Sequence, residues 1–267
     1  RREMDKFDLP LADIICDGGM MNIFRSIGCI GDSLSSGEFE YDNQGEKGYW
    51  DCYEYSWGKQ IERITGIEMT NFSRGGLTAF QLYTEADAGT SPVEDINSLF
   101  SPSHVKQAYI IALAVNDLKG KDVLKKIYNG EVGNAKTDID PEDYNGNRNT
   151  FAGWYAKIIQ RLQSIQPDAK FFLVTMPKED GSEKDFVQVI NGIAEELKNC
   201  FVIDLYSYAP AFDADFRKKY FCGHMNAMGY LLTAHFFMTY IDWIIRHHPE
   251  DFKYVQFIGS DYKPYME

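Results

Sequence analysis

Two apolar patterns alternate along most of the chain. Continuous apolar runs predict buried strands at residues 21–31, 67–73, 107–115, 169–177 and 200–208. Strands that are apolar on both faces are typical of parallel sheets covered by helices on both sides. Apolar residues at helical spacing predict amphipathic helices at residues 53–66, 150–167, 183–199 and 226–248. The first of these helices ends at a glycine and the second at a proline, which are common helix stops.

Alternation of strands with helices predicts an α/β fold, a three-layer α/β/α sandwich with a central parallel sheet. We expect residues 1–267 to form a single domain, with an irregular N-terminal segment over about residues 1–22. The C-terminal tail, about residues 250–267, carries too many aromatic residues for a free tail, so we expect it to dock on the domain. The polar, turn-rich stretch 128–149 is either a solvated loop or a lid that contacts substrate.

Charge and composition exclude several classes of partner. The net charge of −13 should repel phosphate backbones and anionic lipid, so we expect no nucleic acid partner. No apolar run reaches the roughly 20 residues that span a bilayer, so we expect no stable membrane insertion. Five cysteines without a CxxC pair indicate neither a disulfide framework nor a metal site. The N-terminal residues lack the apolar core of a signal peptide, which favours a cytoplasmic location, although a preceding leader would make the protein secreted. The oligomeric state stays open.

Candidate chemistry is concentrated where predicted strands end. Ser33 follows the first strand, Gly76 the second and Asn116 the third, while His224 precedes the last helix. The carboxyl ends of parallel strands meet at one edge of a sheet, where active sites gather, so we expect these residues to lie close together. A hydroxyl, a glycine N–H, an amide and an imidazole are the parts that acyl transfer needs. Each alone is more typical of a turn, a helix cap or a packed side chain, and only their joint occurrence favours a site.

These four segments, in this order, resemble the blocks of the SGNH, or GDSL, hydrolases. That family carries a GDS near the N-terminus, a glycine after the second strand, a GxND and a DxxH near the C-terminus. The matching segments here are Gly31-Asp32-Ser33-Leu34, Gly76, Asn116-Asp117 and His224, and the resemblance spans residues 28–229. It implies a flavodoxin-like SGNH hydrolase fold and ester hydrolysis through an acyl-enzyme, with no metal and no organic cofactor.

The resemblance also implies roles for individual residues. Ser33 would be the nucleophile, and its own N–H would join the oxyanion hole. The N–H of Gly76 and the side-chain amide of Asn116 would supply the other oxyanion donors, each contributing about 3–4 kcal/mol to the transition state in other acyl-transfer enzymes. His224 would act as general base and then as acid for the leaving alcohol. Ala114 replaces the glycine of the GxND block, a modest departure.

A second departure is more serious, because Phe221 stands where the family has the acid that orients its histidine. Three explanations remain open. The enzyme could be a Ser-His dyad in which the Phe221 carbonyl holds the Nδ1–H of His224. An acid could come from elsewhere, the nearest being Asp204, Asp213 and Asp215. The chain could also have lost activity and survive as a binding protein.

The expected partner is a small-molecule or glycan ester. Aromatic residues make up 15% of the chain, and with the acidic stretch 128–149 they suit a cleft that faces a sugar. The sequence therefore favours hydrolysis of a small-acyl ester such as a carbohydrate O-acetyl ester. The alternatives are a lipid esterase of the lysophospholipase type and a noncatalytic carbohydrate-binding protein on the same scaffold.

Overall fold

A parallel sheet forms the centre of the molecule. The computed structural model describes residues 8–209 and 213–264. Within these residues the central sheet has five parallel strands in the order β4-β1-β5-β6-β7. Their bounds are β1 Ser26–Gly31, β4 Glu68–Ser73, β5 Ala108–Ala112, β6 Lys170–Val174 and β7 Cys200–Ile203.

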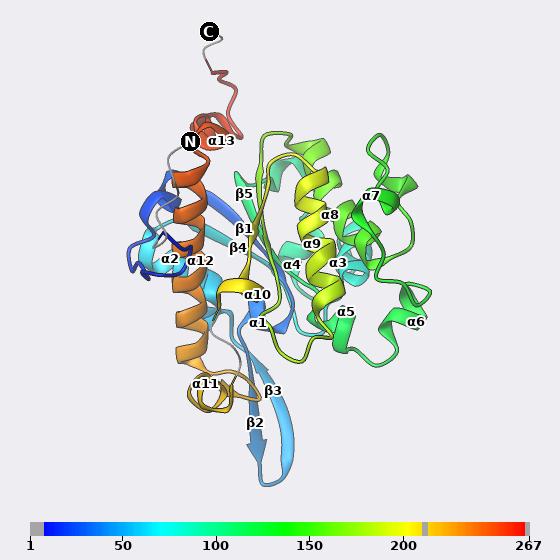
Figure 1. Cartoon of the computed structure of the whole chain (residues 1–267), viewed down its shortest axis with the longest axis vertical. Helices are drawn as coiled ribbons and strands as arrows, with labels where there is room; N and C mark the ends of the chain where they lie inside the picture. The colour runs from blue at the N-terminus through cyan, green and yellow to red at the C-terminus, as the bar shows by residue number, and fades with distance from the viewer. Residues whose placement is uncertain (1–7, 210–212, 265–267) are drawn as a thin grey trace.

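Helices cover both faces of this sheet (Figure 1). One face carries α2 (Trp57–Thr65) and α12 (Ala227–His247), and the other carries α3 (Ala79–Ala88), α8 (Phe151–Ile165) and α9 (Lys184–Glu196). Successive strand residues point to opposite faces. Ile110 therefore packs with the α12 layer, whereas Tyr109 and Ile111 pack with the α8 layer. The prediction of a three-layer α/β/α sandwich is confirmed.

Local capping sets the ends of the helices nearest the site. The Ser56 hydroxyl accepts a hydrogen bond from the N–H of Lys59 and starts α2, which ends at Gly66 with a left-handed φ of 74°. Asn226 starts α12, because its side chain accepts from the N–H of Gly229 at 2.9 Å. His224 lies two residues before this cap.

Shorter elements complete the chain. The short α-helices are α1 Ser33–Ser36, α4 Glu94–Asn97, α5 Val115–Lys119, α6 Val123–Ile127, α7 Ala135–Asp138, α10 Leu205–Tyr208, α11 Ala214–Tyr220 and α13 Pro249–Phe252. The 3₁₀ turns are η1 Gly19–Ile23, η2 Tyr53–Tyr55, η3 Pro102–His104, η4 Tyr144–Gly146 and η5 Val255–Phe257. Residues 205–208, expected to continue a strand, form α10 instead, because the Asp204 carboxylate accepts from the N–H of Ser207 and caps a helix there.

The structure places the stretch 128–149 and the described part of the C-terminal tail, two segments whose role was an expectation from the sequence. The stretch 128–149 is largely exposed, as a solvated loop is, but it contains short helices, and α7 packs against α8 and α9, away from the hairpin described below (Figure 1), which does not favour a lid. The buried Asp138 holds this stretch by accepting from Arg148 at 3.1 Å and from Thr150 at 2.8 Å. In the C-terminal tail, Phe252 and Ile258 are buried in the α12 layer.

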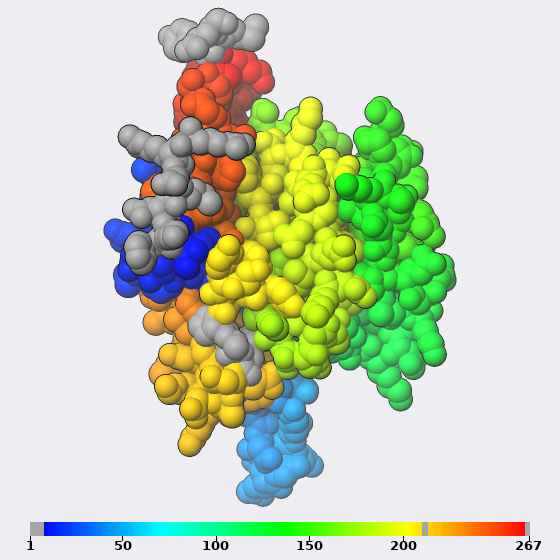
Figure 2. Space-filling view, viewed as in Figure 1, coloured from blue at the N-terminus to red at the C-terminus, as the bar shows by residue number. Residues whose placement is uncertain are grey.

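A two-stranded hairpin projects from the carboxyl edge of the sheet, and the sequence reasoning did not anticipate it. It consists of β2 (Glu38–Asn43) and β3 (Glu46–Asp51), paired antiparallel. Gln44 and Gly45 form its tip with positive φ values of 56° and 91°, as a two-residue hairpin turn requires. Figure 2 shows it protruding in light blue beneath the body of the molecule. Its base contacts a second small hairpin, β8 (Phe221–Cys222) and β9 (His224–Met225).

Candidate active site

Ser33 and His224 meet at the carboxyl edge of the sheet. Ser33 is the first residue of α1, directly after β1, and the preceding Asp32 caps this helix by accepting from the N–H of Leu34. His224 lies in β9. The expected approach of the two side chains is confirmed, because Ser33 Oγ and His224 Nε2 are 2.9 Å apart. Ser33 is buried, with 8% of its surface exposed.

The other nitrogen of His224 contacts an acid on the projecting hairpin. Glu40 Oε1 lies 2.7 Å from Nδ1, and Glu40 Oε2 pairs with Lys47 at 2.5 Å. The hydrogen bond from Lys47 is the largest cause that holds the pKa of Glu40 below its ordinary value. Glu40 therefore stays ionised at neutral pH and accepts the Nδ1–H of the imidazole.

Gly223 makes room for this acid. A Cβ at Gly223 would lie 2.0 Å from Glu40 Oε2, closer than two such atoms can approach. Gly223 also has a φ of +79°, a conformation that only glycine adopts without strain. The residue before the histidine is thus fixed as glycine by the carboxylate that the histidine binds.

The sequence offered three aspartates and the Phe221 carbonyl as partners of His224 Nδ1. That prediction is wrong, because Nδ1 contacts Glu40. Asp204 and Asp213 instead cap α10 and α11, accepting from the N–H groups of Ser207 and Phe216. Asp215 is exposed in the first turn of α11. The Phe221 carbonyl belongs to β8, which pairs with Met225 of β9. Each of these candidates lies shortly before His224 in the chain, whereas the observed acid, Glu40, lies 184 residues before it.

A second carboxylate stands on the same face of β2. Glu38 is two residues before Glu40, so both side chains point to the same side of the strand. Glu38 Oε2 lies 3.3 Å from His224 Nε2, the nitrogen that also contacts Ser33. Desolvation is the largest cause that raises the pKa of Glu38, while His224 acts to lower it. Sequence reasoning missed both residues.

The loop after β4 holds Gly76 next to this cluster. Arg74 donates to the carbonyl of Gly75 at 2.7 Å and also pairs with Glu85, which fixes the loop. Gly76 has a φ of +77°, and a Cβ there would meet open space, so its surroundings leave room for a substrate atom. Asn116 Nδ2 donates one hydrogen to the carbonyl of Leu77 at 3.1 Å, which leaves its second N–H for another acceptor. The structure thus brings the loop of Gly76 and the side chain of Asn116 together.

Ala114 is strained. Its φ is +115°, so the position where the family carries glycine still has the backbone that glycine prefers. A non-glycine residue in such a conformation costs of order 1–3 kcal/mol. The replacement is therefore less modest than the sequence comparison suggested.

Two buried acids lie behind the nucleophile. Burial raises the pKa of Asp32 to about 7 and that of Asp117 to about 6, and the charge of Asp117 adds to the rise at Asp32. Asp117 Oδ1 accepts from the N–H of Ala79 and from the hydroxyl of Tyr128, which ties α5 to the start of α3. The second oxygen of each carboxyl has no hydrogen-bond partner among the described residues.

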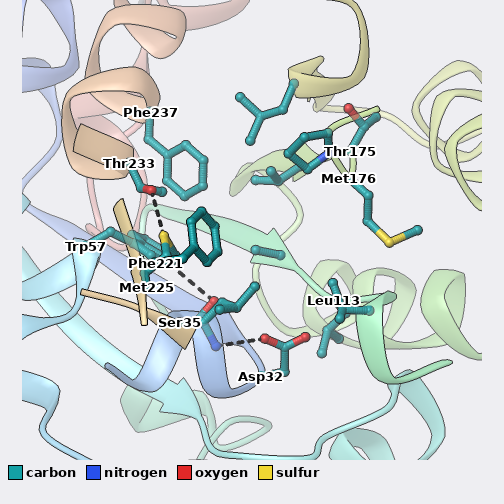
Figure 3. A pocket seen from close by; sticks show the side chains of 16 residues that line it. Asp32, Ser35, Trp57, Leu113, Thr175, Met176, Phe221, Met225, Thr233 and Phe237 are labelled. Atoms are coloured by element: carbon teal, nitrogen blue, oxygen red, sulfur yellow. Dashed lines mark hydrogen bonds between the residues drawn. The ribbon is translucent and has the colours of Figure 1, made fainter. Parts of the chain in front are cut away.

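An apolar pocket adjoins the nucleophile (Figure 3). Its volume is about 110 Å³, and its walls include Trp57, Met225 and Phe237. Asp32 and Leu34, on either side of Ser33 in sequence, also line it, but Ser33 and His224 do not. In Figure 3 the Asp32 carboxyl stands at its lower edge.

No group of three or more histidine, cysteine or acidic side chains within residues 8–209 and 213–264 is arranged to hold a metal ion. In the same residues no helix is long and apolar enough to cross a bilayer.

A sequence signal for the hairpin does exist. Residues 38–42 alternate charged and aromatic side chains, and Asn43-Gln44-Gly45 is a turn signal before a second run of charged and aromatic residues at 46–51. This pattern predicts a hairpin with its acids on one face. It does not predict that this face meets His224, because that contact depends on how distant segments pack.

Comparison with known proteins adds information on the fold alone. No family model and no curated protein matches the chain. Among solved structures, the family 3 carbohydrate esterase of Clostridium thermocellum is 16% identical with a TM-score of 0.52, over 83% of this chain and 97% of that one. A G-D-S-L family protein from Desulfitobacterium hafniense DCB-2 is 19% identical with a TM-score of 0.50, over 80% and 98%.

A carbohydrate esterase family 2 enzyme with a carbohydrate binding domain, from Corynascus thermopiles (Myceliophthora fergusii), is 19% identical with a TM-score of 0.51. That match covers 81% of this chain and 65% of the longer relative. At these identities the likeness shows a shared fold and nothing about the side chains. The chain has the three-layer α/β/α fold of the GDSL-type hydrolases.

Proposed function

We propose that this protein is a serine ester hydrolase with Ser33 as nucleophile, His224 as base and Glu40 as the orienting acid. One observation carries the proposal: two hydrogen bonds in series run from Ser33 Oγ through both nitrogens of His224 to Glu40, at 2.9 and 2.7 Å. A serine hydroxyl is a weak nucleophile until a base takes its proton. This arrangement supports a Ser-His-Glu triad in place of the dyad considered from the sequence.

Glu40 sets the tautomer of the imidazole. Because the carboxylate accepts from Nδ1–H, the lone pair of Nε2 is free to accept the Ser33 proton. Ser33 Oγ then attacks the ester carbonyl, and the imidazolium that forms lies against the Glu40 carboxylate. His224 returns the proton to the leaving alcohol, and a water activated by the same nitrogen releases the acyl group from Ser33.

The negative charge that develops on the carbonyl oxygen needs donors. The N–H of Ser33 is at the start of a helix, where it has no intrahelical partner. The N–H of Gly76 and the second N–H of Asn116 complete the proposed oxyanion hole. The hydrogen bonds of Arg74 and Asn116 that fix the loop of Gly76 support it, because oxyanion donors must be positioned before the reaction.

Two features favour a short acyl group on a carbohydrate. The pocket beside the nucleophile has about 110 Å³, less than the roughly 150 Å³ of a cavity that takes benzene, so a long lipid chain does not fit it. Tyr49 is 55% exposed with its ring 5.7 Å from that of His224, which offers a surface for a sugar ring. The carbohydrate esterases with this fold agree with the same class.

The test is hydrolysis of p-nitrophenyl acetate and p-nitrophenyl octanoate by the wild type and by Ser33→Ala. We expect turnover of acetate above octanoate and its loss in the variant. A preference for octanoate would redirect the assignment to lipid esters.

A fluorophosphonate probe separates the enzyme from the noncatalytic carbohydrate-binding alternative. Covalent labelling of the wild type but not of Ser33→Ala is expected for an activated serine. If the wild type is neither labelled nor active on either ester, the proposed function is wrong.

A further inference from the structure

The proposed triad does not use Glu38, although this side chain lies against its base. Glu38 Oε2 is 3.3 Å from His224 Nε2, and the side chain is 16% exposed. A Cβ at Gly75 would lie 2.3 Å from Glu38 Oε1, so the other carboxylate oxygen faces the loop that carries Gly76. The carboxylate therefore stands between the base and the proposed oxyanion loop, beside the reacting atoms.

The position of Glu38 is built into the fold. Tyr230 of α12 donates to the Glu38 carbonyl at 2.6 Å and lies 3.4 Å from the Ser33 carbonyl, which ties the start of β2 to the nucleophile. Across the hairpin, Glu38 pairs directly with Asp51. Like charges in directly opposed positions destabilise a strand pair. Stability of the hairpin therefore does not explain a glutamate at this position.

Nε2 of the histidine defines where the leaving group must be. In the proposed reaction this nitrogen gives its proton to the alcohol oxygen of the ester, which must come within hydrogen-bond distance of it. Because Glu38 Oε2 is 3.3 Å from the same nitrogen, it borders the space that the alcohol half of the substrate occupies. A hydroxyl on the carbon next to the one that bears the ester oxygen would then lie within hydrogen-bond reach of that carboxylate.

We propose that Glu38 is a specificity-determining residue that accepts a hydrogen bond from a free hydroxyl adjacent to the ester in the alcohol half of the substrate. This inference rests on the proposed function and narrows its substrate class to monoesters of vicinal diols, the arrangement found around a partly acylated sugar ring. The ion pair of Lys47 is with Glu40 and not with Glu38, and a hydroxyl donates a stronger hydrogen bond to a carboxylate than to a neutral acceptor. Esters whose alcohol carries an anionic group are repelled by the same charge.

The experiment uses two acetate esters in which the donor hydrogen of one is replaced by a methyl group in the other. The substrates are 2-hydroxyethyl acetate and 2-methoxyethyl acetate, assayed at pH 8, and the readout is the ratio of their kcat/KM values. A hydrogen bond to a charged group predicts a preference of about tenfold or more for the hydroxyl ester in the wild type. We expect the ratio to fall in Glu38→Gln and to approach one in Glu38→Leu, which has no acceptor.

Asp51→Asn is the matched control. It removes the same charge from the facing strand of the hairpin, at a side chain that is exposed. The ratio should keep its wild-type value there, which separates a hydrogen bond at Glu38 from a general effect of negative charge. A ratio also cancels any partial loss of folded protein in a variant.

The outcomes separate this inference from the proposed function. Turnover that depends on Ser33 but shows a wild-type ratio of one, or a ratio that both Glu38 variants leave unchanged, would overturn the role of Glu38 alone. Variants that hydrolyse both esters faster by the same factor would show that Glu38 obstructs the site, which also overturns it. Absence of any Ser33-dependent turnover would overturn the proposed function, and the inference with it.

Discussion

The two halves of the candidate site are built in different ways. Ser33, Gly76 and Asn116 follow strands of a buried parallel sheet, whose residues are held by two apolar layers. Glu38 and Glu40 lie on a two-stranded hairpin that projects from the domain, with Tyr41, Tyr49 and Trp50 more than half exposed. An isolated two-stranded hairpin is marginal in water, whereas a covered sheet is stable by itself.

The two regions therefore have different roles in the proposed reaction. The sheet fixes where the nucleophile and the oxyanion donors are, and the hairpin decides whether the base has the right tautomer. The hairpin reaches that position through contacts at its base: the N–H of Cys52 donates to the Gly37 carbonyl at 3.0 Å, and Tyr230 holds the Glu38 carbonyl. Substitutions in the hairpin should therefore change catalysis more than stability, and substitutions at the sheet edge should change both.

The largest effect is expected for Glu40→Gln. Loss of the carboxylate removes the acceptor that fixes the tautomer, and the equivalent change in a serine protease lowers kcat by about 10⁴. We expect a fall of about 10³–10⁴ in kcat on p-nitrophenyl acetate, with a cooperative thermal unfolding transition that shows the variant is folded.

Asp204→Asn serves as the control for Glu40→Gln, because Asp204 was the acid candidate after β7 and instead caps α10 and accepts from the Thr175 hydroxyl at 3.3 Å. Its kcat should stay within a few-fold of the wild type. A several-hundredfold fall at Asp204 with little change at Glu40 would reverse the assignment.

An intermediate effect is expected for Gly223→Ala. The new Cβ displaces Glu40 Oε2, and the left-handed backbone adds strain of about 1 kcal/mol. We expect kcat to fall about 10²-fold and the free energy of unfolding to fall by about 1 kcal/mol, measured by steady-state kinetics and urea unfolding.

Two further variants isolate the clash. Gly66→Ala has a similar φ of +74° but open space around its Cβ, so it should lose stability without losing activity. If Gly223 acts through the acid, adding Gly223→Ala to Glu40→Gln should slow the enzyme little further. Fully additive losses would contradict this coupling.

The smallest effect concerns the sheet edge. Ala114→Gly relieves the φ of +115° and should raise the free energy of unfolding by about 1 kcal/mol, less than the full strain because glycine gains freedom in the unfolded chain. The substitution should leave the acetate-to-octanoate preference as it is. A loss of stability in urea unfolding would show that Ala114 is not strained.

Sequence reasoning reached the sheet but not the hairpin. The strands and the residues after them were predictable, because buried parallel strands have a strong pattern and their carboxyl ends always meet. The acid was not, because Phe221 directed the search to the residues around His224. Asp204 and Asp213 already carried a local signal for helix capping, an acid directly before a helical segment. The contact between Glu40 and His224 joins segments whose approach no local pattern encodes.

The site depends on the register of β2, because alternate residues of this strand face opposite sides. Glu38 and Glu40 face His224, while the intervening Phe39 packs on the opposite side against Tyr55 and Tyr230. One residue inserted between Gly37 and Glu38 would exchange the two faces and present aromatic rings to the base. Insertions at the tip would leave the chemistry untouched. A change in length is therefore compatible with the triad at the tip, residues 44 and 45, and removes the acid from His224 at the base of the hairpin.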